Sequence, residues 1–474
     1  MKKGNIKHLM KKDPDAAIDK FIRLCGKLEL KPEAQNKLLS MFKDAFLPDA
    51  SIRIEIDWDK VHPLTNEEMI PYDSLLEPVN APDLLNQVIY IKLNGGLASN
   101  MGCDFPKSLV KCADDLTFFD IICEQIKDIN KTYNVNVPLI LMNSFITDEQ
   151  MKPHIENIKD LEIYTFLQNR FPRIFEKTWE PIPDSPEFPN SGWNPPGHAD
   201  VYNCLRDSGL LDKFISQGKK YMMVSNIDNV GARLDLKILN KVISEQIPYA
   251  CEIVDRHPDE WKGGLPIIYE NHKKLLETVQ VPPNHMDEFT SIPYFHTNNI
   301  WVNLEKLKES LDNGTLQEDV MKTHGLFNGK PVIQLESASG SVIQSFPEAI
   351  VIKVHRRRFI PVKASNELLL MRADLFIKKE NAEFRINPKR TVSGFPHITL
   401  SQEFQRVVDF DQRIPHPPSI YNLVSLNVDG DVWFGKDVVL EGNVTIYCPK
   451  NEKFVIPDGY HIKNREITSV LQLK

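Results

Sequence analysis

An apolar pair that recurs every six residues marks the C-terminal part of the chain. Leu426 and Val428 make the first pair, and the same spacing continues through Val432 and Phe434, Val438 and Leu440, and Val444 and Ile446. A six-residue repeat is typical of parallel β-helices. Antiparallel strands with one buried face also bring apolar residues to positions i and i+2. Because four units follow one another without a break, the pattern favours a small parallel β-helix.

The middle of the chain, from about residue 87 to 375, has a different pattern. Short apolar runs that end in polar clusters alternate with helical stretches, and the runs cover residues 88–93, 138–142, 163–166, 221–224 and 250–254. This alternation predicts a doubly wound α/β domain, in which ligands bind beyond the carboxyl ends of the strands. The proline-rich stretch 180–197 is too long for a plain connection, so it is expected to border an active site.

The N-terminal part divides into a helical segment and a connector. Apolar residues recur at helical spacing between residues 13 and 45, whereas residues 47–86 are rich in proline and acidic side chains. We therefore expect three parts: an N-terminal helical segment with its connector (1–86), an α/β domain (87–375) and a C-terminal β-helix domain (376–474).

Charge and cysteine usage exclude several classes of protein. A formal net charge of -8 argues against a nucleic-acid binder, which needs a basic surface to displace counterions. No stretch approaches the roughly 18 apolar residues of a membrane span, so no membrane partner is expected. The seven cysteines are scattered and form no C-x-x-C pair, which argues against a disulfide framework or a zinc site. A cytoplasmic location fits these features best.

A glycine-rich stretch, LNGGLASNMGCDFPKS (93–108), directly follows the apolar run VIYIKL. Gly95 and Gly96 let the backbone turn sharply and approach a ligand closely, and Lys107 adds a cation after Pro106. A P-loop is excluded because proline stands where glycine must precede the lysine, and the glycine spacing does not match G-x-G-x-x-G. A glycine pair near a lysine is also consistent with a purely structural turn.

Together with other blocks, this stretch resembles the UTP–glucose-1-phosphate uridylyltransferase family, also called UDP-glucose pyrophosphorylases. The further blocks are LMNSFITDEQ (141–150), FLQNRFPRI (166–174), WNPPGHADVY (193–202), VSNIDNVGA (224–232), KGG (262–264), VPPNHMDEF (281–289), HTNNIWVNL (296–304), LESASGS (335–341) and RRRFIPVKASNELLL (356–370). They follow the family's order and span most of the chain.

The resemblance implies a fold, a reaction and partners. Residues 87–375 would form a Rossmann-like nucleotidyltransferase domain that is catalytic and binds the nucleotide sugar, followed by a left-handed parallel β-helix. The reaction would join UTP and glucose 1-phosphate into UDP-glucose and pyrophosphate, reversibly and with Mg²⁺. Homo-oligomers could form through the β-helix, although family members differ in assembly.

For the nucleotide, the resemblance implies binding by Leu93, Asn94, Gly95 and Gly96, with Gln168 reading the uracil edge and Gly197 and Asn226 nearby. The Gln amide offers both a donor and an acceptor, as recognition of one base requires. Alone, a single Gln is most often a surface residue. The same resemblance gives His198 and Asn226 contacts with the sugar phosphate, although a lone histidine in a proline-rich loop is more often structural.

For the phosphates, the resemblance makes Lys107 and Lys363 the catalytic cations and Asp228 the metal ligand. Hard cations such as Mg²⁺ take oxygen ligands and retain phosphate oxygens and waters. By spacing alone, Asp228 could equally cap the next helix. The three arginines at 356–358 receive no role.

For the sugar, the resemblance points to Gly263, Gly264, Glu288 and Asn299, each of which could equally be a turn or cap residue. Five departures from the family pattern stand at Ala98, Asn100, Asp104, Phe105 and Ala199. An alanine at 98 fits the loop only if its φ is negative.

Two other functions remain open. One is the same chemistry on another sugar 1-phosphate, and the other is a non-catalytic scaffold that binds sugar nucleotides. In the uridylyltransferase reaction the nucleophile is already anionic, so the two lysines and the metal would serve to neutralise charge.

Overall fold

The computed structural model describes residues 14–26, 32–46, 56–182, 192–257, 260 and 262–473. Its centre is an eight-stranded sheet in the order β2-β18-β12-β15-β11-β3-β6-β7. The five apolar runs of the sequence become β3 (Val88–Asn94), β6 (Leu139–Asn143), β7 (Ile163–Leu167), β11 (Tyr221–Asn226) and β12 (Tyr249–Asp255). All neighbouring strands are parallel except at β15 (Tyr294–Asn303), which pairs antiparallel with β11 and β12. The predicted α/β class with a parallel sheet core is therefore confirmed.

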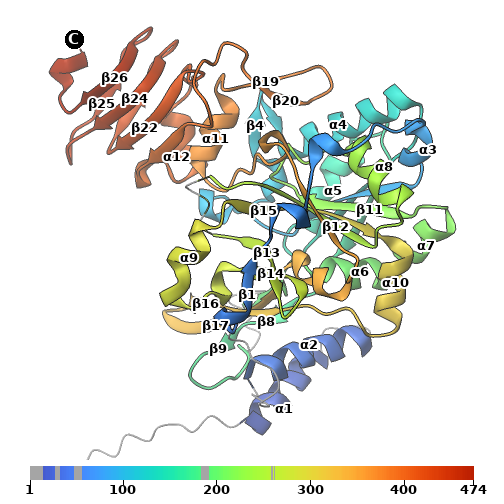
Figure 1. Cartoon of the computed structure of the whole chain (residues 1–474). Helices are drawn as coiled ribbons and strands as arrows, with labels where there is room; N and C mark the ends of the chain where they lie inside the picture. Colours follow the sequence, from blue (N-terminus) through green and yellow to red (C-terminus); the bar gives the residue numbers. More distant parts are fainter. Residues whose placement is uncertain are drawn as a thin grey trace, which may run out of the picture.

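Helices cover both faces of this sheet (Figure 1). On one face, α6 (Asp200–Asp207), α7 (Leu210–Ser216) and α10 (Leu304–Asp312) bury apolar residues against Ile89 and Ile91 of β3. On the other, α3 (Ala81–Leu85), α4 (Phe118–Tyr133), α5 (Asp148–Glu156) and α8 (Leu236–Ser244) pack against Val88 and Tyr90 of the same strand. Successive side chains of a strand point to opposite faces, so a strand such as β3, which is buried on both faces, supports two layers of helices.

Strands β15 and β18 (Ile350–Lys353) were not expected from the sequence. The polar residues HTNN interrupt the apolar character of β15, although nine of its ten residues are buried. A strand whose interior carries polar side chains lacks the continuous apolar run that marks a buried strand.

The N-terminal part forms α1 (Pro14–Cys25) and α2 (Pro32–Phe46), as its helical spacing predicts. Phe21 of α1 stacks on Phe42 of α2 and also contacts Phe171 in the body of the protein. The connector that follows contributes β1 (Val61–Pro63), which pairs with β13, and β2 (Met69–Pro71), which forms an edge of the central sheet. The connector is thus part of the α/β core.

Smaller elements surround the central sheet. They are β4 (Lys111–Ala113) with β5 (Leu116–Thr117), β8 (Phe171–Pro172) with β10 (Trp193–Asn194), β13 (Gly264–Tyr269) with β14 (His272–Glu277), and β9 (Ile174–Phe175) with β16 (Val320–Phe327) and β17 (Lys330–Ser337). Also present are α9 (Met286–Ser291), α11 (Ser365–Arg372), α12 (Val407–Arg413), the hairpin β19 (Phe376–Lys378) and β20 (Phe384–Ile386), and a 3₁₀ segment, η9 (Ser339–Ser345).

The C-terminal part contains parallel strands in two sheets. One holds β21 (His397–Leu400), β22 (Leu423–Asp429), β24 (Val439–Tyr447) and β26 (His461–Ile467), and the other holds β23 (Val432–Phe434) and β25 (Phe454–Ile456). Leu426 lies opposite Val444, and Val432 lies opposite Phe454. All eight apolar residues of the six-residue repeat are buried. The parallel pairing excludes the antiparallel alternative.

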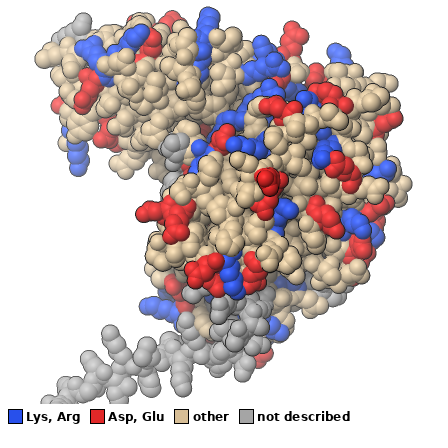
Figure 2. All heavy atoms as spheres, viewed as in Figure 1, with Lys and Arg blue, Asp and Glu red and all other residues tan. Residues whose placement is uncertain are grey.

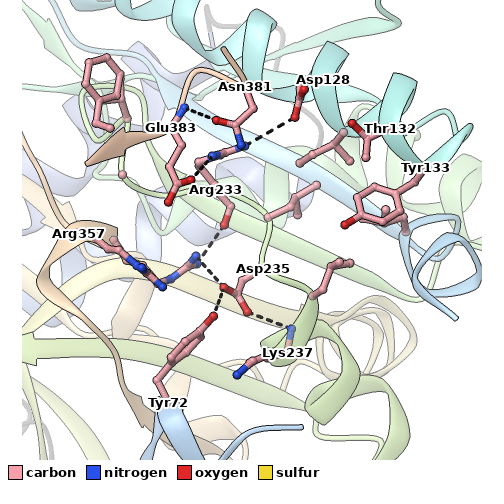
Figure 3. Close-up of a pocket in the computed structure, with 18 of the residues that line it drawn as sticks. Tyr72, Asp128, Thr132, Tyr133, Arg233, Asp235, Lys237, Arg357, Asn381 and Glu383 are labelled. Carbon is pink, nitrogen blue, oxygen red and sulfur yellow. Dashed lines mark hydrogen bonds and ion pairs between the residues drawn. The ribbon is translucent and has the colours of Figure 1, made fainter. Parts of the chain in front are cut away.

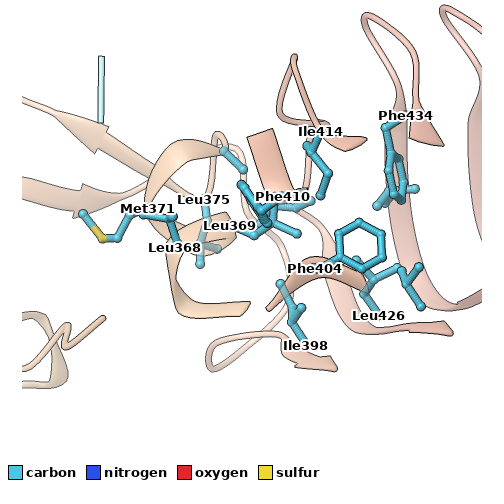
Figure 4. Packing of buried hydrophobic residues seen from close by; sticks show 14 of the residues in the cluster. Leu368, Leu369, Met371, Leu375, Ile398, Phe404, Phe410, Ile414, Leu426 and Phe434 are labelled. Carbon is cyan, nitrogen blue, oxygen red and sulfur yellow. The ribbon is translucent and has the colours of Figure 1, made fainter. Parts of the chain in front are cut away.

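One apolar cluster joins this part to the rest of the molecule. It contains Leu368 and Leu369 of α11, Phe404 and Phe410 around α12, and the buried repeat residues (Figure 4). The same cluster reaches Ala98 in the glycine-rich loop, so it crosses the expected boundary between residues 375 and 376.

Four further observations bear on the sequence analysis. Residues 183–191 of the proline-rich stretch 180–197 lie outside the described residues. All seven cysteines are unpaired. Among the residues that the structure describes, no helix has the length and apolar character needed to cross a membrane. Figure 2 shows acidic and basic side chains interspersed over one face, without a single basic patch.

Candidate functional site

The candidate site lies at the carboxyl ends of four neighbouring strands. The loops after β3, β6, β7 and β11 begin with Gly95, Ser144, Gln168 and Ile227. Since these strands are parallel and adjacent, their loops meet at one edge of the sheet. Residues separated by more than a hundred positions in sequence are brought together there.

The glycine-rich loop is closed on itself by backbone hydrogen bonds. The amide of Lys107 donates to the oxygen of Gly96 (3.1 Å), and the amide of Ala98 donates to the oxygen of Phe105 (3.3 Å). Ala98 is buried with φ -82°, so its Cβ is accommodated without strain. The departure from the family pattern at this position leaves the loop geometry intact, and Ala199, with φ -64°, needs no glycine either.

Gln168 lies between the glycine loop and the loop that carries His198. Its amide nitrogen donates to the oxygen of Gly197 (2.6 Å). A Cβ at Gly95 would stand 2.5 Å from the Gln168 Oε1, and one at Gly197 would stand 2.2 Å from the amide of Ser337. Gly197 is therefore required by the close backbone of Ser337, whereas a side chain at position 95 would displace the Gln168 amide. Gly95, Gln168 and Gly197, three of the nucleotide-binding residues expected from the sequence, lie next to one another.

Lys107 and Asp228 form an ion pair. The Lys107 Nζ lies 2.5 Å from the Asp228 Oδ2, and the two side chains are only 18% and 8% exposed. The other carboxylate oxygen of Asp228, Oδ1, is buried and has no hydrogen-bond partner. A buried carboxylate oxygen left free in this way is suited to one ligand position of a hard cation.

No set of three or more His, Cys, Asp or Glu side chains that could hold a metal ion occurs within the described part of the chain. The described residues therefore contain no group of three or more such side chains that could enclose a metal ion. Magnesium in nucleotide sites generally takes one or two protein carboxylates, with phosphate oxygens and waters as its other ligands.

Lys363 lies beside the loop that contains Asp228. The amide of Val362 donates to the backbone oxygen of Asp228 (3.3 Å). Pro361 forms an isolated antiparallel β-bridge with Asn229. Burial raises the pKa of Glu367, while Lys363 and Lys107 both act to lower it. Both lysines are therefore close enough to the Glu367 carboxyl group to influence its pKa.

His198 is part of a chain of hydrogen bonds that reaches β11. The amide of Ser339 donates to the His198 Nδ1 (2.9 Å), and the Ser339 hydroxyl donates to the Asn298 Oδ1 (2.7 Å). The Asn298 amide in turn donates to the Asn226 Oδ1 (2.8 Å). This fixes His198 and Asn226, which both have predicted contacts with the sugar phosphate, relative to each other.

The same contacts define the state of the imidazole. Burial lowers the pKa of His198 to about 4, so the ring is neutral at physiological pH. Because Nδ1 accepts from Ser339, the ring proton sits on Nε2. His198 can therefore donate one hydrogen bond to an anionic ligand. The neighbouring His296 has its pKa lowered to about 3 by burial and by His198.

The side chains of two residues expected to bind the sugar, Asn299 and Glu288, make other contacts in the structure. Asn299 is fully buried, and its amide nitrogen donates to Glu252 (3.1 Å) and to the backbone oxygen of Arg358 (3.2 Å). The Oδ1 of Asn299 accepts from Asn229 (3.3 Å), which leaves no free polar group. The amide that faces the site is that of Asn298, whose positive φ of 58° turns it toward Asn226.

Glu288 lies on the outside of α9, with its side chain 62% exposed. Its carboxylate accepts from the Trp58 Nε1 (2.8 Å) and contacts the His285 Nδ1 (2.8 Å). The carboxylate is thus engaged at the surface. A more suitable one belongs to Glu277: a Cβ at Gly264 would stand 2.7 Å from its Oε1, and a Cβ at Gly263 would stand 2.4 Å from the Phe295 ring. Burial raises the pKa of Glu277 to about 7, against the opposing effect of Lys363.

Lys92 is a further residue that the sequence analysis missed. It is fully buried, and its ammonium donates to the backbone oxygens of Asn226 (3.3 Å), Asn229 (3.2 Å) and Ala232 (3.3 Å). Burial lowers its pKa to about 7, whereas Asp228 acts to raise it. Lys92 thus holds the loop that carries Asp228. A lysine within an otherwise apolar strand was the signal that could have identified it.

Arg358 provides a second support for this loop. Arg358 binds Glu252 through two nitrogens (2.7 and 2.6 Å) and donates to the backbone oxygen of Arg233 (3.0 Å). Asp235 accepts from Tyr72 (2.8 Å) and caps α8. Tyr72, Arg233, Asp235 and Arg358 line a cavity of about 480 Å³. Tyr72, Arg233 and Asp235 can be seen around it in Figure 3. Lys92 and Arg358 therefore both hold the loop through its backbone oxygens.

Comparison with known proteins gives consistent results. The sequence model of a family described as UTP–glucose-1-phosphate uridylyltransferase matches residues 37–441. A UTP–glucose-1-phosphate uridylyltransferase from Hordeum vulgare is 43% identical over 422 residues, covering 87% of this chain and 89% of the relative. The protein of the same name from Saccharomyces cerevisiae is 37% identical over 450 residues, covering 93% and 90%.

Solved structures resemble the whole chain. A mutant UDP-glucose pyrophosphorylase from Leishmania major in complex with UDP-glucose has a TM-score of 0.86 at 28% identity, covering 96% of this chain and 99% of that one. A UDP-glucose phosphorylase from Trypanosoma brucei has a TM-score of 0.86 at 30% identity, covering 96% and 100%.

Proposed function

The chain belongs to the UTP–glucose-1-phosphate uridylyltransferase family, and we infer that it is a nucleotidyltransferase that makes UDP-glucose and pyrophosphate from UTP and glucose 1-phosphate. The observation that carries this function is the 43% identity to a uridylyltransferase over 87% of the chain. The resemblance includes the glycine loop, the two lysines and Asp228, which lie around one edge of the sheet.

The chemistry is a direct displacement at the α-phosphorus of UTP. A phosphate oxygen of glucose 1-phosphate forms the new P–O bond, the bond to the bridging α,β-oxygen breaks, and that electron pair leaves with pyrophosphate. The nucleophile is already anionic, so the protein needs no general base. The main obstacle is repulsion between two polyanions, which Lys107 and Lys363 reduce by adding positive charge at the reacting phosphates.

Different residues bind the nucleotide and the sugar phosphate. The backbone of Leu93, Asn94, Gly95 and Gly96 holds the uridine, and Gln168 reads the uracil edge. His198 donates from its Nε2 to the sugar phosphate beside Asn226. Gly263 and Gly264 receive the hexose with Asn298 and Glu277, because hydroxyl groups require close backbone, amide and carboxylate partners.

Asp228 would hold Mg²⁺ through its free Oδ1. Bound magnesium would supply positive charge to the phosphate oxygens that it shares with the lysines. We expect Asp228→Ala to weaken the magnesium dependence of turnover and also to lower the affinity for Mn²⁺ in the presence of UTP, measured by electron paramagnetic resonance. An unchanged metal titration in both assays would contradict this assignment.

Pyrophosphate release with different sugar 1-phosphates is the most direct test of the function. Glucose 1-phosphate should be preferred over galactose and N-acetylglucosamine 1-phosphates. A preference for another sugar would favour the related sugar pyrophosphorylases, and the absence of any exchange with UTP would favour a non-catalytic scaffold.

We further propose three parts of the chain, 1–86, 87–375 and 376–474, and a left-handed β-helix in the last. The spacing of paired residues supports the β-helix. Leu426 lies opposite Val444, 18 residues later, so one turn corresponds to three six-residue repeats. We also propose that the protein assembles into homo-oligomers through this part and that it is cytoplasmic. Sedimentation of the intact protein and of a variant altered on β26 would test the assembly.

A further inference from the structure

Lys37 of α2 inserts its ammonium group between two carboxylates of the catalytic part. Its Nζ lies 3.2 Å from the Asp200 Oδ1 and 3.0 Å from the Glu318 Oε1. The three side chains are 17%, 1% and 11% exposed, respectively. Burial acts to lower the pKa of Lys37, but Glu318 and Asp200 outweigh it and raise that pKa above its ordinary value. The cation is therefore permanently charged in its buried position.

Asp200 connects this cation to the uracil side of the site. Its Oδ2 accepts from the backbone amide of Asn169 (2.8 Å), and its Oδ1 accepts from the Asn169 side chain (3.2 Å). Asn169 directly follows Gln168, and Asp200 begins α6 two residues after His198. One carboxylate thus ties together the chain segments that carry both ligand-binding side chains.

Glu318 connects the same cation to the loop on the other side of His198. Its Oε2 accepts from the Ser337 hydroxyl (2.9 Å). The amide of Ser337 donates to the oxygen of Pro196 (2.9 Å), and its oxygen accepts from the amide of Ala199 (3.0 Å). Ser337 therefore brackets the Gly197–His198 turn and depends on Glu318 for its orientation.

Lys37, Asp200 and Glu318 form an ion triad. This triad is separate from the apolar contacts that dock the N-terminal helices. An apolar cluster that includes Phe21, Phe42 and Phe171 provides that packing. Among the described residues, Lys37 is the cation that stands within ion-pair distance of Asp200 and of Glu318. Without it, two nearly buried carboxylates would remain uncompensated, which is strongly unfavourable and would drive them apart or into solvent.

We propose that Lys37 is a positioning residue for uridylyl transfer: by neutralising Asp200 and Glu318, it fixes the segments that carry Gln168 and His198. This inference rests on the proposed roles of those two residues in substrate binding. The N-terminal helix α2 then contributes to the substrate site through Lys37.

Steady-state kinetics of the full-length protein test the proposal. Lys37→Met removes the charge and keeps the length of the side chain. We expect KM for UTP and for glucose 1-phosphate to rise about tenfold or more, with a smaller change in kcat, because ground-state contacts are loosened while Lys107 and Asp228 are untouched. Lys37→Arg should restore most of the affinity. Lys43→Met, an exposed lysine of the same helix, is the matched control and should stay within about twofold.

The outcomes separate the possibilities. A lowered melting temperature in Lys37→Met with KM values within twofold of the wild type would make the triad merely structural and overturn the proposal. If Lys37→Met does not fold, the double variant Lys37→Met/Glu318→Gln removes one uncompensated carboxylate together with the ammonium, and a wild-type KM there would overturn it equally. Inactivity of the wild-type protein with UTP would instead refute the proposed function.

Discussion

Single lysine residues neutralise the negative charge of the two polyanionic substrates. Lys107 is ion-paired to Asp228, and Lys363 lies near the same region through its neighbour Val362. The Lys107 side chain is only 18% exposed, so its ammonium group interacts more strongly with phosphate oxygens than it would in water.

Replacing either lysine should therefore lower turnover. We expect Lys107→Ala or Lys363→Ala to reduce kcat by roughly a hundred- to a thousandfold, the usual scale for one lost electrostatic contact in a preorganised site. Pyrophosphate release at saturating substrate measures it. Lys111→Ala, an exposed lysine paired with Asp115, serves as the control and should be near wild type. Near-normal turnover in both active-site variants would remove these lysines from the mechanism.

The buried imidazole of His198 gives a pH dependence with a defined sign. Its pKa is lowered to about 4 in the folded protein and is near 6.5 in an unfolded chain, so the unfolded state binds more protons between these values. Acidification through this window therefore destabilises the native protein, by up to about 2 kcal/mol at pH 5 from this group. Above pH 6.5 the contribution vanishes.

His198→Asn keeps an acceptor near the Ser339 amide and removes the titrating ring. Between pH 7 and pH 5 its free energy of unfolding should fall less than that of the wild type, as measured by urea denaturation. Its KM for glucose 1-phosphate should rise by the same factor at pH 6.5 and at pH 8, because the wild-type ring is neutral at both. An identical pH dependence of stability in the two proteins would contradict the buried neutral state.

At the scale of elements, the loop between β11 and α8 is the part that needs the most support. Lys92 donates to three backbone oxygens between Asn226 and Ala232. Arg358 donates to the backbone oxygen of Arg233 and also binds Glu252. Glu252 is fully buried, so its charge is tolerated only because Arg358 and Trp301 contact it.

Arg358→Met should therefore destabilise the protein by about 3–5 kcal/mol, since it leaves a buried carboxylate unpaired. Adding Glu252→Gln should recover part of that loss because it removes the uncompensated charge. The neighbouring exposed Arg357→Met is the control, expected to change the unfolding free energy by no more than about 0.5 kcal/mol. If the double variant were no more stable than Arg358→Met, the ion pair would not be the source of the effect.

At the scale of the whole molecule, one apolar core joins the C-terminal strands to the α/β part. Phe404 is fully buried between the strand residues Leu426 and Phe434 and the helix residue Phe410 (Figure 4). Because the cluster extends to the glycine loop, loosening it is expected to affect the stability of the whole protein in a single transition.

Phe404→Ala should lower the free energy of unfolding by about 3–5 kcal/mol through lost burial and a residual cavity. Val424→Ala, which truncates a side chain 44% exposed on β22, should change it by about 0.5 kcal/mol or less. Urea denaturation followed by both fluorescence and circular dichroism would measure this. Two separate transitions in Phe404→Ala, with only one of them shifted, would show that the parts unfold independently.

The sequence by itself determined five of the eight strands of the central sheet and the order of the main parts along the chain. Apolar periodicity depends on neighbouring residues, so the five core strands, the N-terminal helices and the buried repeat residues such as Leu426 and Val444 could be read directly. The family resemblance supplied the glycine loop, Gln168, His198 and the two lysines, because their blocks are continuous in sequence.

Only the tertiary structure decided which polar side chain faces the site. Asn298 and Asn299 are adjacent, and a positive φ at Asn298 determines which of them turns toward Asn226. Glu277 rather than Glu288 lies beside Gly264, and Lys37 reaches Asp200 across 163 positions of sequence. Such contacts depend on where whole elements meet in space, and local sequence patterns carry no information about that distance.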